Sequence, residues 1–251
     1  MTIQLSPDQV MKRTYRVRLR TLLILVGCLL PVLSAADCVV LLHGLARSPT
    51  SMVPLARALE SAGYDVVNVG YPSRERPIEE LAPLAIEEGI SLCSSKEDLV
   101  HFVTHSLGGI LVRYYLTTQV LPRLDKVVML APPNQGSEVV DRLRELPGFS
   151  FLNGPAGLQL GTDESSVPRS LGAVKFTLGV IAGDDSFNPI LSSQLPDPDD
   201  GKVSVESTRV EGMTDFVVVP HSHTFIMRAP DVIEQVLFFL RTGSFNHEPA
   251  A

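Results

Sequence analysis

The sequence has few cysteines, few basic residues and no apolar stretch of transmembrane length, and each of these shortages argues against one class of protein. It has only three cysteines in 251 residues and no C-x-x-C pair or Cys and His cluster at zinc-ligand spacing, so we expect no structural metal. Lys and Arg number 21 against 28 Asp and Glu, with no basic cluster after residue 20, which argues against nucleic-acid binding. The one long apolar stretch, 21–33, is too short for a comfortable transmembrane helix.

The first 36 residues have the pattern of an export signal. Five basic residues between Lys12 and Arg20 precede the apolar stretch 21–33, and Ser34-Ala35-Ala36 supplies small residues at the spacing of a cleavage site. We therefore expect 1–36 to be a signal peptide. An uncleaved anchor is one alternative, and a lipoprotein is another, because Leu25-Val26-Gly27-Cys28 resembles a lipobox.

Residues 37–251 would then form one α/β domain, periplasmic or secreted, or anchored facing the periplasm with only the N-terminal segment at the membrane. The 45% apolar composition suits one sizeable domain. Without 1–36 the chain keeps 16 basic and 27 acidic residues, a net charge of −11. Two cysteines remain, Cys38 and Cys93, and an even pair in an oxidising compartment predicts a disulfide. The alternative is two buried free thiols.

Short apolar runs alternate with segments of helical spacing from Cys38 onwards. The runs at 38–42, 65–69, 99–103, 126–130, 176–182 and 215–219 have the length of buried strands. Strands that alternate with helices predict right-handed crossovers and a parallel sheet. The alternation lapses at about 138–173, where the sequence favours either a short lid or acyl-pocket wall, or an ordinary surface loop.

The stretch 100–111 predicts a strand, a tight turn and a helix, with Ser106 at the apex of the turn. A serine at such an apex is forced clear of the sheet, and the helix N-terminus behind it offers N–H groups to a developing anion. Gly108 supplies a small residue where the backbone pinches, whereas Thr104 stands where a glycine is usual. The alternative is a serine that merely caps a helix.

Candidate partners for Ser106 follow later strands. A serine nucleophile needs a base to take its proton, and the base needs an acid to hold its tautomer. The carboxyl ends of parallel strands meet at one edge of the sheet, so the order Ser, Asp, His brings all three together. From position alone the acid and the base both stay open. The acids are Asp184, Asp199 and Asp200, and the histidines are His221 and His223.

Four motifs together resemble the α/β-hydrolase superfamily, and within it the bacterial lipase-like and esterase-like serine hydrolases. The resemblance covers nearly everything from Cys38 to the closing helix. It implies a compact α/β-hydrolase fold, with a mostly parallel sheet of about six strands flanked by helices on both faces. The motifs are Leu42-His43-Gly44-Leu45, Thr104-His105-Ser106-Leu107-Gly108-Gly109, Asp200-Gly201-Lys202-Val203 and His223.

The resemblance also implies roles for single residues. Ser106 would be the nucleophile, with Asp200 favoured as the acid and His223 favoured as the base. The backbone N–H groups of Leu45 and Leu107 would form the oxyanion hole. His43 and His105 would position these groups without a chemical step of their own.

The expected function is cleavage of a small-molecule or lipid carboxylic ester through an acyl-enzyme intermediate. Acyl transfer or thioester cleavage on the same fold is an alternative, and so is a non-catalytic binding protein. We expect no cofactor. Several similar secreted lipases hold calcium through an Asp shortly after the histidine, but here Thr224-Phe225-Ile226-Met227 occupies that place, so we expect no such ion.

Overall fold

The structure is a computed structural model that describes residues 36–248. The predicted signal peptide at 1–36 lies outside the described residues, apart from its last residue. Within residues 36–248, no helix has both the length and the apolar content needed to cross a membrane.

Six parallel strands form one sheet in the order β2-β1-β3-β4-β5-β6, which confirms the predicted sheet. The central strands β1 and β3 are buried along their whole length. β1 is accordingly apolar throughout, whereas β3 also buries His101, Thr104 and His105. The strands are β1 (Cys38–Leu42), β2 (Asp65–Val69), β3 (Val100–His105), β4 (Leu124–Leu130), β5 (Thr177–Gly183) and β6 (Asp215–Val219).

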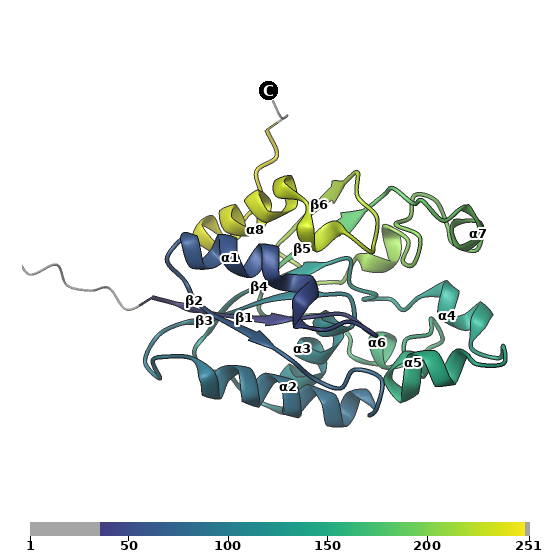
Figure 1. Ribbon diagram of the computed structural model, residues 1–251, viewed down its shortest axis with the longest axis horizontal. Helices are drawn as coiled ribbons and strands as arrows, with labels where there is room; N and C mark the ends of the chain where they lie inside the picture. The colour runs from purple at the N-terminus through teal and green to yellow at the C-terminus, as the bar shows by residue number, and fades with distance from the viewer. Residues whose placement is uncertain (1–35, 249–251) are drawn as a thin grey trace, which may run out of the picture. The chain divides into compact units, whose positions relative to one another are not determined.

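Helices cover both faces of the sheet (Figure 1). On one face lie α2 (Ile78–Leu92) and α3 (Leu107–Thr118), and on the other lie α1 (Val53–Ser61) and α8 (Pro230–Thr242). Successive side chains of a strand point to opposite faces, so β1 supplies both cores. Val40 and Leu42 belong to the core beneath α2 and α3, and Val39 belongs to the core beneath α1 and α8.

The closing helix α8 shows why these segments start and stop where they do. It begins with Pro230, which has no N–H group and so leaves none unpaired in the first turn. Asp231 places a negative charge at the positive end of the helix dipole. It ends at Gly243, which has a φ of 83°. Glycine adopts this left-handed conformation without the steric cost that a side chain would bring.

The segment 138–173 contains more helix than its sequence suggests. It forms α4 (Glu138–Leu143), α5 (Phe149–Leu158) and α6 (Val167–Ser170). Gly154 breaks α5 into two short pieces with a φ of 66°, and a Cβ at this position would lie 1.8 Å from the carbonyl oxygen of Arg74. Neither piece is long enough to show a helical period. Figure 1 places α4, α5 and α7 (Pro189–Ser192) beyond the carboxyl ends of the strands.

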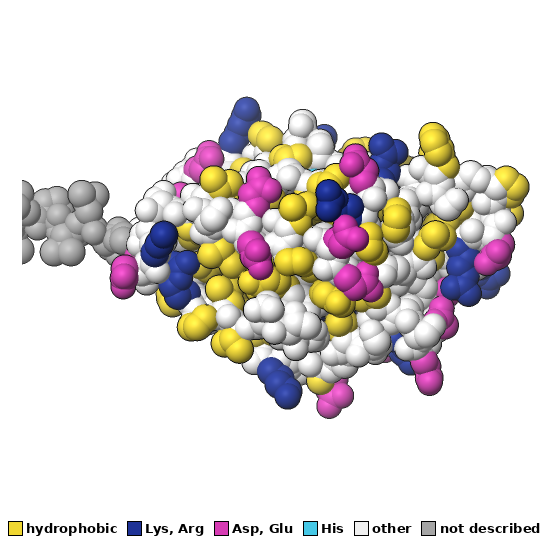
Figure 2. Space-filling model, turned by 90° about the horizontal axis from the view of Figure 1, so that it is seen from below, with side chains coloured by type: hydrophobic (Ala, Val, Ile, Leu, Met, Phe, Trp, Pro, Cys, Tyr) yellow, Lys and Arg dark blue, Asp and Glu magenta, His cyan; other side chains and the backbone are white. Residues whose placement is uncertain are grey.

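Three single turns of 3-10 helix complete the described chain, and they lie in its connections. They are η1 (Pro49–Met52), η2 (Glu206–Thr208) and η3 (Ile226–Arg228). On the face shown in Figure 2, acidic and basic side chains are interspersed among apolar ones. This face therefore offers no concentrated field of one sign to a highly charged partner.

A disulfide joins Cys38 to Cys93 and confirms the predicted pairing. Cys38 begins β1, and Cys93 directly follows α2, so the bond ties the first strand to the helix that covers it. Both residues are buried in the same core. The alternative of two free thiols is therefore wrong.

The disulfide should contribute a large share of stability, because it closes a loop with a sequence separation of 55 residues. We expect the Cys38→Ala, Cys93→Ala double variant to lose on the order of 4 kcal/mol of unfolding free energy, as the chain-entropy model gives for such a loop. Urea denaturation measures the loss. Two alkylatable thiols in denatured, unreduced wild-type protein would contradict the pairing.

Candidate active site

Ser106 stands between β3 and α3 in a strained backbone conformation, with a φ of 53° and a ψ of −119°. A positive φ in a residue with a side chain costs about 1–3 kcal/mol, so its surroundings have to impose it. The Ser106 N–H donates to the carbonyl of Leu130 on β4 at 2.9 Å. A Cβ at Gly108 would lie 2.7 Å from the carbonyl oxygen of Leu42 on β1. The turn is thus held by both neighbouring strands.

His223 connects Ser106 to Asp200. The Oγ of Ser106 lies 3.0 Å from Nε2 of His223, and Nδ1 of His223 lies 2.7 Å from Oδ2 of Asp200. All three residues are buried. With a proton on Nδ1, the imidazole donates to the Asp200 carboxylate, and Nε2 is free to accept from the Ser106 hydroxyl.

The Asp200 carboxylate is fixed by its own loop. Its Oδ1 accepts from the backbone N–H groups of Lys202 at 3.0 Å and Val203 at 2.8 Å. Its backbone carbonyl accepts from the N–H of His223 at 3.0 Å. These bonds set the orientation of the carboxylate and tie its loop to the loop that carries the histidine.

The structure separates the residues that position alone left open. Asp199 is buried, but its oxygens accept from the N–H of Gly201 and the hydroxyl of Ser192. Asp184 is exposed. His221 faces Asp231, with Nε2 2.7 Å from the carboxylate. Of all the candidates, Ser106, Asp200 and His223 are the three that come together.

The two expected oxyanion donors, the N–H groups of Leu107 and Leu45, come from different segments of the chain. Leu107 is the first residue of α3, where backbone N–H groups have no partner within the helix. Leu45 follows β1 and lines the same cavity as Ser106. The next residue, Ala46, has a φ of 55°, and its N–H donates to the hydroxyl of Ser73 at 3.1 Å. The role of both leucines stays a prediction.

A cavity of about 310 Å³ opens beside Ser106 and His223. Much of its wall is apolar and comes from α4, α5 and the residues that follow them, so the segment 138–173 forms part of the wall. The apolar side chains from this segment are Val139, Val140, Leu143, Phe149, Leu152 and Leu160.

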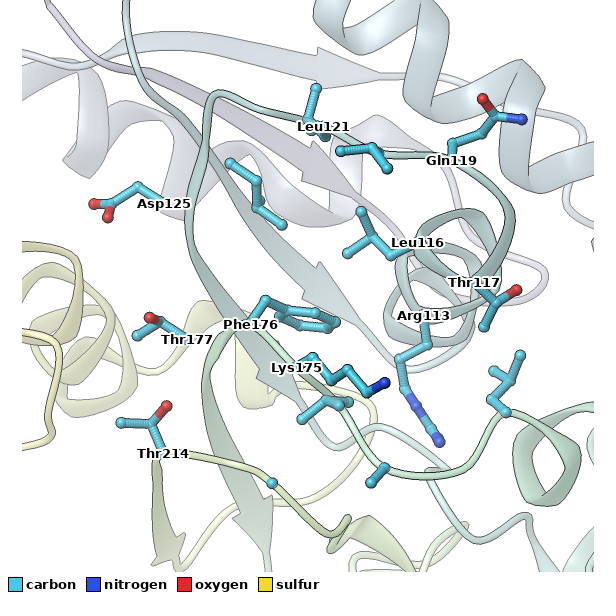
Figure 3. A pocket seen from close by; sticks show the side chains of 16 residues that line it. Arg113, Leu116, Thr117, Gln119, Leu121, Asp125, Lys175, Phe176, Thr177 and Thr214 are labelled. Atoms are coloured by element: carbon cyan, nitrogen blue, oxygen red, sulfur yellow. The ribbon is translucent and has the colours of Figure 1, made fainter.

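A larger cavity of about 940 Å³ lies at the opposite edge of the sheet, near the first residues of β4 and β5 (Figure 3). Its polar side chains include Arg113, Asp125 and Lys175, and its lining contains no Ser, His or Cys among the described residues. Burial lowers the pKa of Arg113 to about 10, and its guanidinium donates to the carbonyls of Asn134 and Gly172. The smaller cavity is therefore the candidate active site.

His105 and His43 contact backbone groups around the site. The Nε2–H of His105 donates to the carbonyl of His223 at 3.0 Å, and burial followed by the His223 charge lowers the pKa of His105 well below its usual value. His43 stacks on Tyr71 at 4.1 Å between ring centroids, and the Tyr71 hydroxyl donates to the His43 carbonyl. Burial lowers the pKa of His43 as well. Both rings are thus neutral near pH 7.

Two cations at this site had no role in the sequence analysis. Arg47 and Lys202 line the cavity together with Ser106. Lys202 stands inside the motif Asp200-Gly201-Lys202-Val203, and Arg47 lies two residues after the motif Leu42-His43-Gly44-Leu45. The two positions are 155 residues apart, so the sequence does not reveal that they line one cavity. Within residues 36–248, no group of three His, Cys, Asp or Glu side chains is arranged to hold a metal ion.

The chain belongs to the alpha/beta hydrolase family, whose sequence model matches residues 39–201. The lipase BlEst2 of Bacillus licheniformis in its mature form is 16% identical and superposes with a TM-score of 0.63, covering 84% of this chain and 93% of that one. The metagenomic carboxyl esterase MGS0156 is 20% identical, with a TM-score of 0.61 and coverage of 76% and 65%.

Lipase B of Aspergillus fumigatus is 16% identical, with a TM-score of 0.59, covering 82% of this chain and 52% of that one. At such low identity these structures share the fold alone. A search of curated protein sequences gave no significant match. The family membership confirms the resemblance seen in the motifs.

The neutral His105 should make the protein sensitive to acid. Its folded pKa lies well below 6.5, so below about pH 6.5 the unfolded chain binds a proton that the folded chain does not, and the unfolding free energy falls as pH falls. This residue alone gives a slope of up to about 1.4 kcal/mol per pH unit.

His105→Gln keeps an N–H donor for the His223 carbonyl and should flatten that slope. Urea unfolding between about pH 7.5 and 5.5 measures it. His247→Gln, at a ring that is more than half exposed, is the matched control and should not flatten it. An unchanged slope in the His105 variant would contradict this interpretation.

Proposed function

We propose that the protein is an exported serine hydrolase that cleaves carboxylic esters. Ser106 is the nucleophile, His223 the general base and Asp200 the acid that orients the base. The observation that carries this proposal is the hydrogen-bonded chain from the Ser106 hydroxyl through His223 to Asp200 at the wall of an apolar cavity. The Cys38–Cys93 disulfide supports a periplasmic or secreted location, because such bonds persist in oxidising compartments.

In the first half of the reaction, Nε2 of His223 takes the proton of the Ser106 hydroxyl while Oγ attacks the ester carbonyl. The carbonyl oxygen becomes an oxyanion, which the N–H groups of Leu45 and Leu107 stabilise. Each such donor is worth a few kcal/mol in comparable enzymes. The protonated His223 then gives its proton to the departing alcohol, which leaves an acyl group on Ser106.

In the second half, His223 takes a proton from water, and the resulting hydroxide attacks the acyl-enzyme. Collapse of the second tetrahedral intermediate releases the carboxylic acid and returns the proton to Ser106. Asp200 stays ionised throughout and stabilises the imidazolium that forms twice per turnover. The apolar wall from α4 and α5 suits the acyl chain, because burying methylene groups there is favourable.

The nucleophile is tested by covalent labelling. A fluorophosphonate probe should label the wild-type protein at Ser106, and Ser106→Ala should lose both labelling and ester hydrolysis while it keeps its fold, as checked by circular dichroism. The exposed Ser193 provides the matched control, so Ser193→Ala should label normally. Absence of labelling in the folded wild type would favour a non-catalytic binding protein, and labelling without hydrolysis would favour acyl transfer.

The base and the acid are tested by paired variants. His223→Ala and Asp200→Asn should each lower kcat by about a thousandfold or more, as removal of triad partners does in other serine hydrolases. The controls His221→Ala and Asp184→Asn change neighbouring residues that do not contact Ser106, and they should stay within a few-fold of wild type. Near-normal rates in His223→Ala would overturn the assignment.

A further inference from the structure

The candidate site contains two cations that the proposed reaction does not use. Arg47 comes from the turn after β1 and Lys202 from the loop that follows Asp200, and both line the cavity beside Ser106 and His223. Arg47 is half-buried and Lys202 is exposed. The two loops are far apart in sequence, so the folded sheet is what places both charges beside the nucleophile.

The two charges lie close to each other and to the reacting groups. Desolvation followed by the Arg47 charge lowers the pKa of Lys202. The pKa of His105 is lowered mainly by burial and by the His223 charge, and the charges of Arg47 and Lys202 lower it further. These effects agree with the cavity lining, in which Arg47 and Lys202 share one wall with His105 and Ser106.

Neither cation forms an ion pair with a carboxylate of the described residues. No ion pair within 36–248 involves the side chain of Arg47 or Lys202. Asp200 is close enough to oppose the lowering of the Lys202 pKa, but its oxygens are occupied by His223 and backbone N–H groups. Arg228 adds a third positive charge near Arg47, which lowers the pKa of Arg47 further after burial.

Two cations side by side are electrostatically unfavourable. The chain has an excess of acids, 28 against 21 basic residues, yet Arg47 and Lys202 line the cavity without an ion pair to any carboxylate within residues 36–248. Like charges near one another repel. A bound anion removes this cost, and a guanidinium with an ammonium is a combination that binds the oxygens of phosphate or carboxylate well.

We infer that Arg47 and Lys202 form an anion-binding subsite, so that the substrates of this site are carboxylic esters whose alcohol part carries a phosphate or carboxylate group. The inference rests on the proposed function and names its substrate class. The apolar wall from α4 and α5 takes the acyl chain, and the cations bind the anionic alcohol part. The scissile carbonyl then lies between the two, at Ser106.

Four soluble butyrate esters test the inference. Dibutyrylglycerol 3-phosphate carries a phosphate, O-butyryl-lactate a carboxylate, dibutyrylglycerol no charge, and butyrylcholine a positive charge. Butyrate release gives kcat/KM for each. We expect the anionic esters to be preferred over the neutral one by about tenfold or more, butyrylcholine to be the poorest, and the preference to shrink as salt screens the charges. The two anionic esters decide between phosphate and carboxylate.

Variants then assign the preference to the two side chains. Arg47→Gln and Lys202→Gln should each lower the ratio of kcat/KM for the preferred anionic ester to kcat/KM for the neutral ester by about tenfold, mainly through the KM of the anionic ester. Lys202→Glu should shift the preference toward butyrylcholine. Lys175→Gln, at the opposite edge of the sheet, is the matched control and should change nothing.

The possible failures are distinguishable. Equal rates for anionic and neutral esters in the wild type would overturn the subsite and leave the hydrolase proposal intact. An equal loss for all four esters in Arg47→Gln and Lys202→Gln, with Ser106 still labelled by a neutral fluorophosphonate, would show that the cations assist the reaction itself, and would also overturn it. No hydrolysis of any ester, together with no labelling of Ser106, would overturn the proposed function instead.

Discussion

The site depends on how closely the start of α3 approaches the end of β1. The first turn of α3 lies against the carbonyl of Leu42, at a distance that admits a glycine at position 108 and nothing larger. This approach imposes the positive φ of Ser106 and holds its hydroxyl toward His223. Relaxing the turn would release about 1–3 kcal/mol of strain but would move the serine away from its partners. The cores on both faces of the sheet supply the stability that maintains it.

Much of the frame was predictable from the sequence, because its signals are local. Strands buried in a parallel sheet are rich in apolar residues, and the partly exposed edge strands β2 and β6 also keep short apolar runs, so the six runs identified the six strands. The pair Cys38 and Cys93 could be matched because no third cysteine follows residue 36. Gly108, two residues after Ser106, also marked the tight turn, because only a small residue fits there.

The rest depends on contacts between distant loops, which leave little trace in sequence. Asp199 and Asp200 are adjacent and chemically identical, and what separates them is the direction of each side chain: one turns toward Gly201 and Ser192, the other toward His223. The break at Gly154 hid α5, because each half is too short for a helical period. The meeting of Arg47 with Lys202 arises only when the sheet is assembled.

The disulfide makes the unfolding free energy of the protein depend on the redox state of its surroundings. It closes the segment from Cys38 to Cys93, which contains Leu45 and Arg47 but leaves Ser106, Asp200 and His223 outside the loop. Domains of this size are stable by about 5–15 kcal/mol in all, and one such bond is a large fraction of that reserve. A chain held under reducing conditions therefore has a lower unfolding free energy than the oxidised chain. The rest of that free energy is added when the two thiols are oxidised in the compartment where the protein is to work.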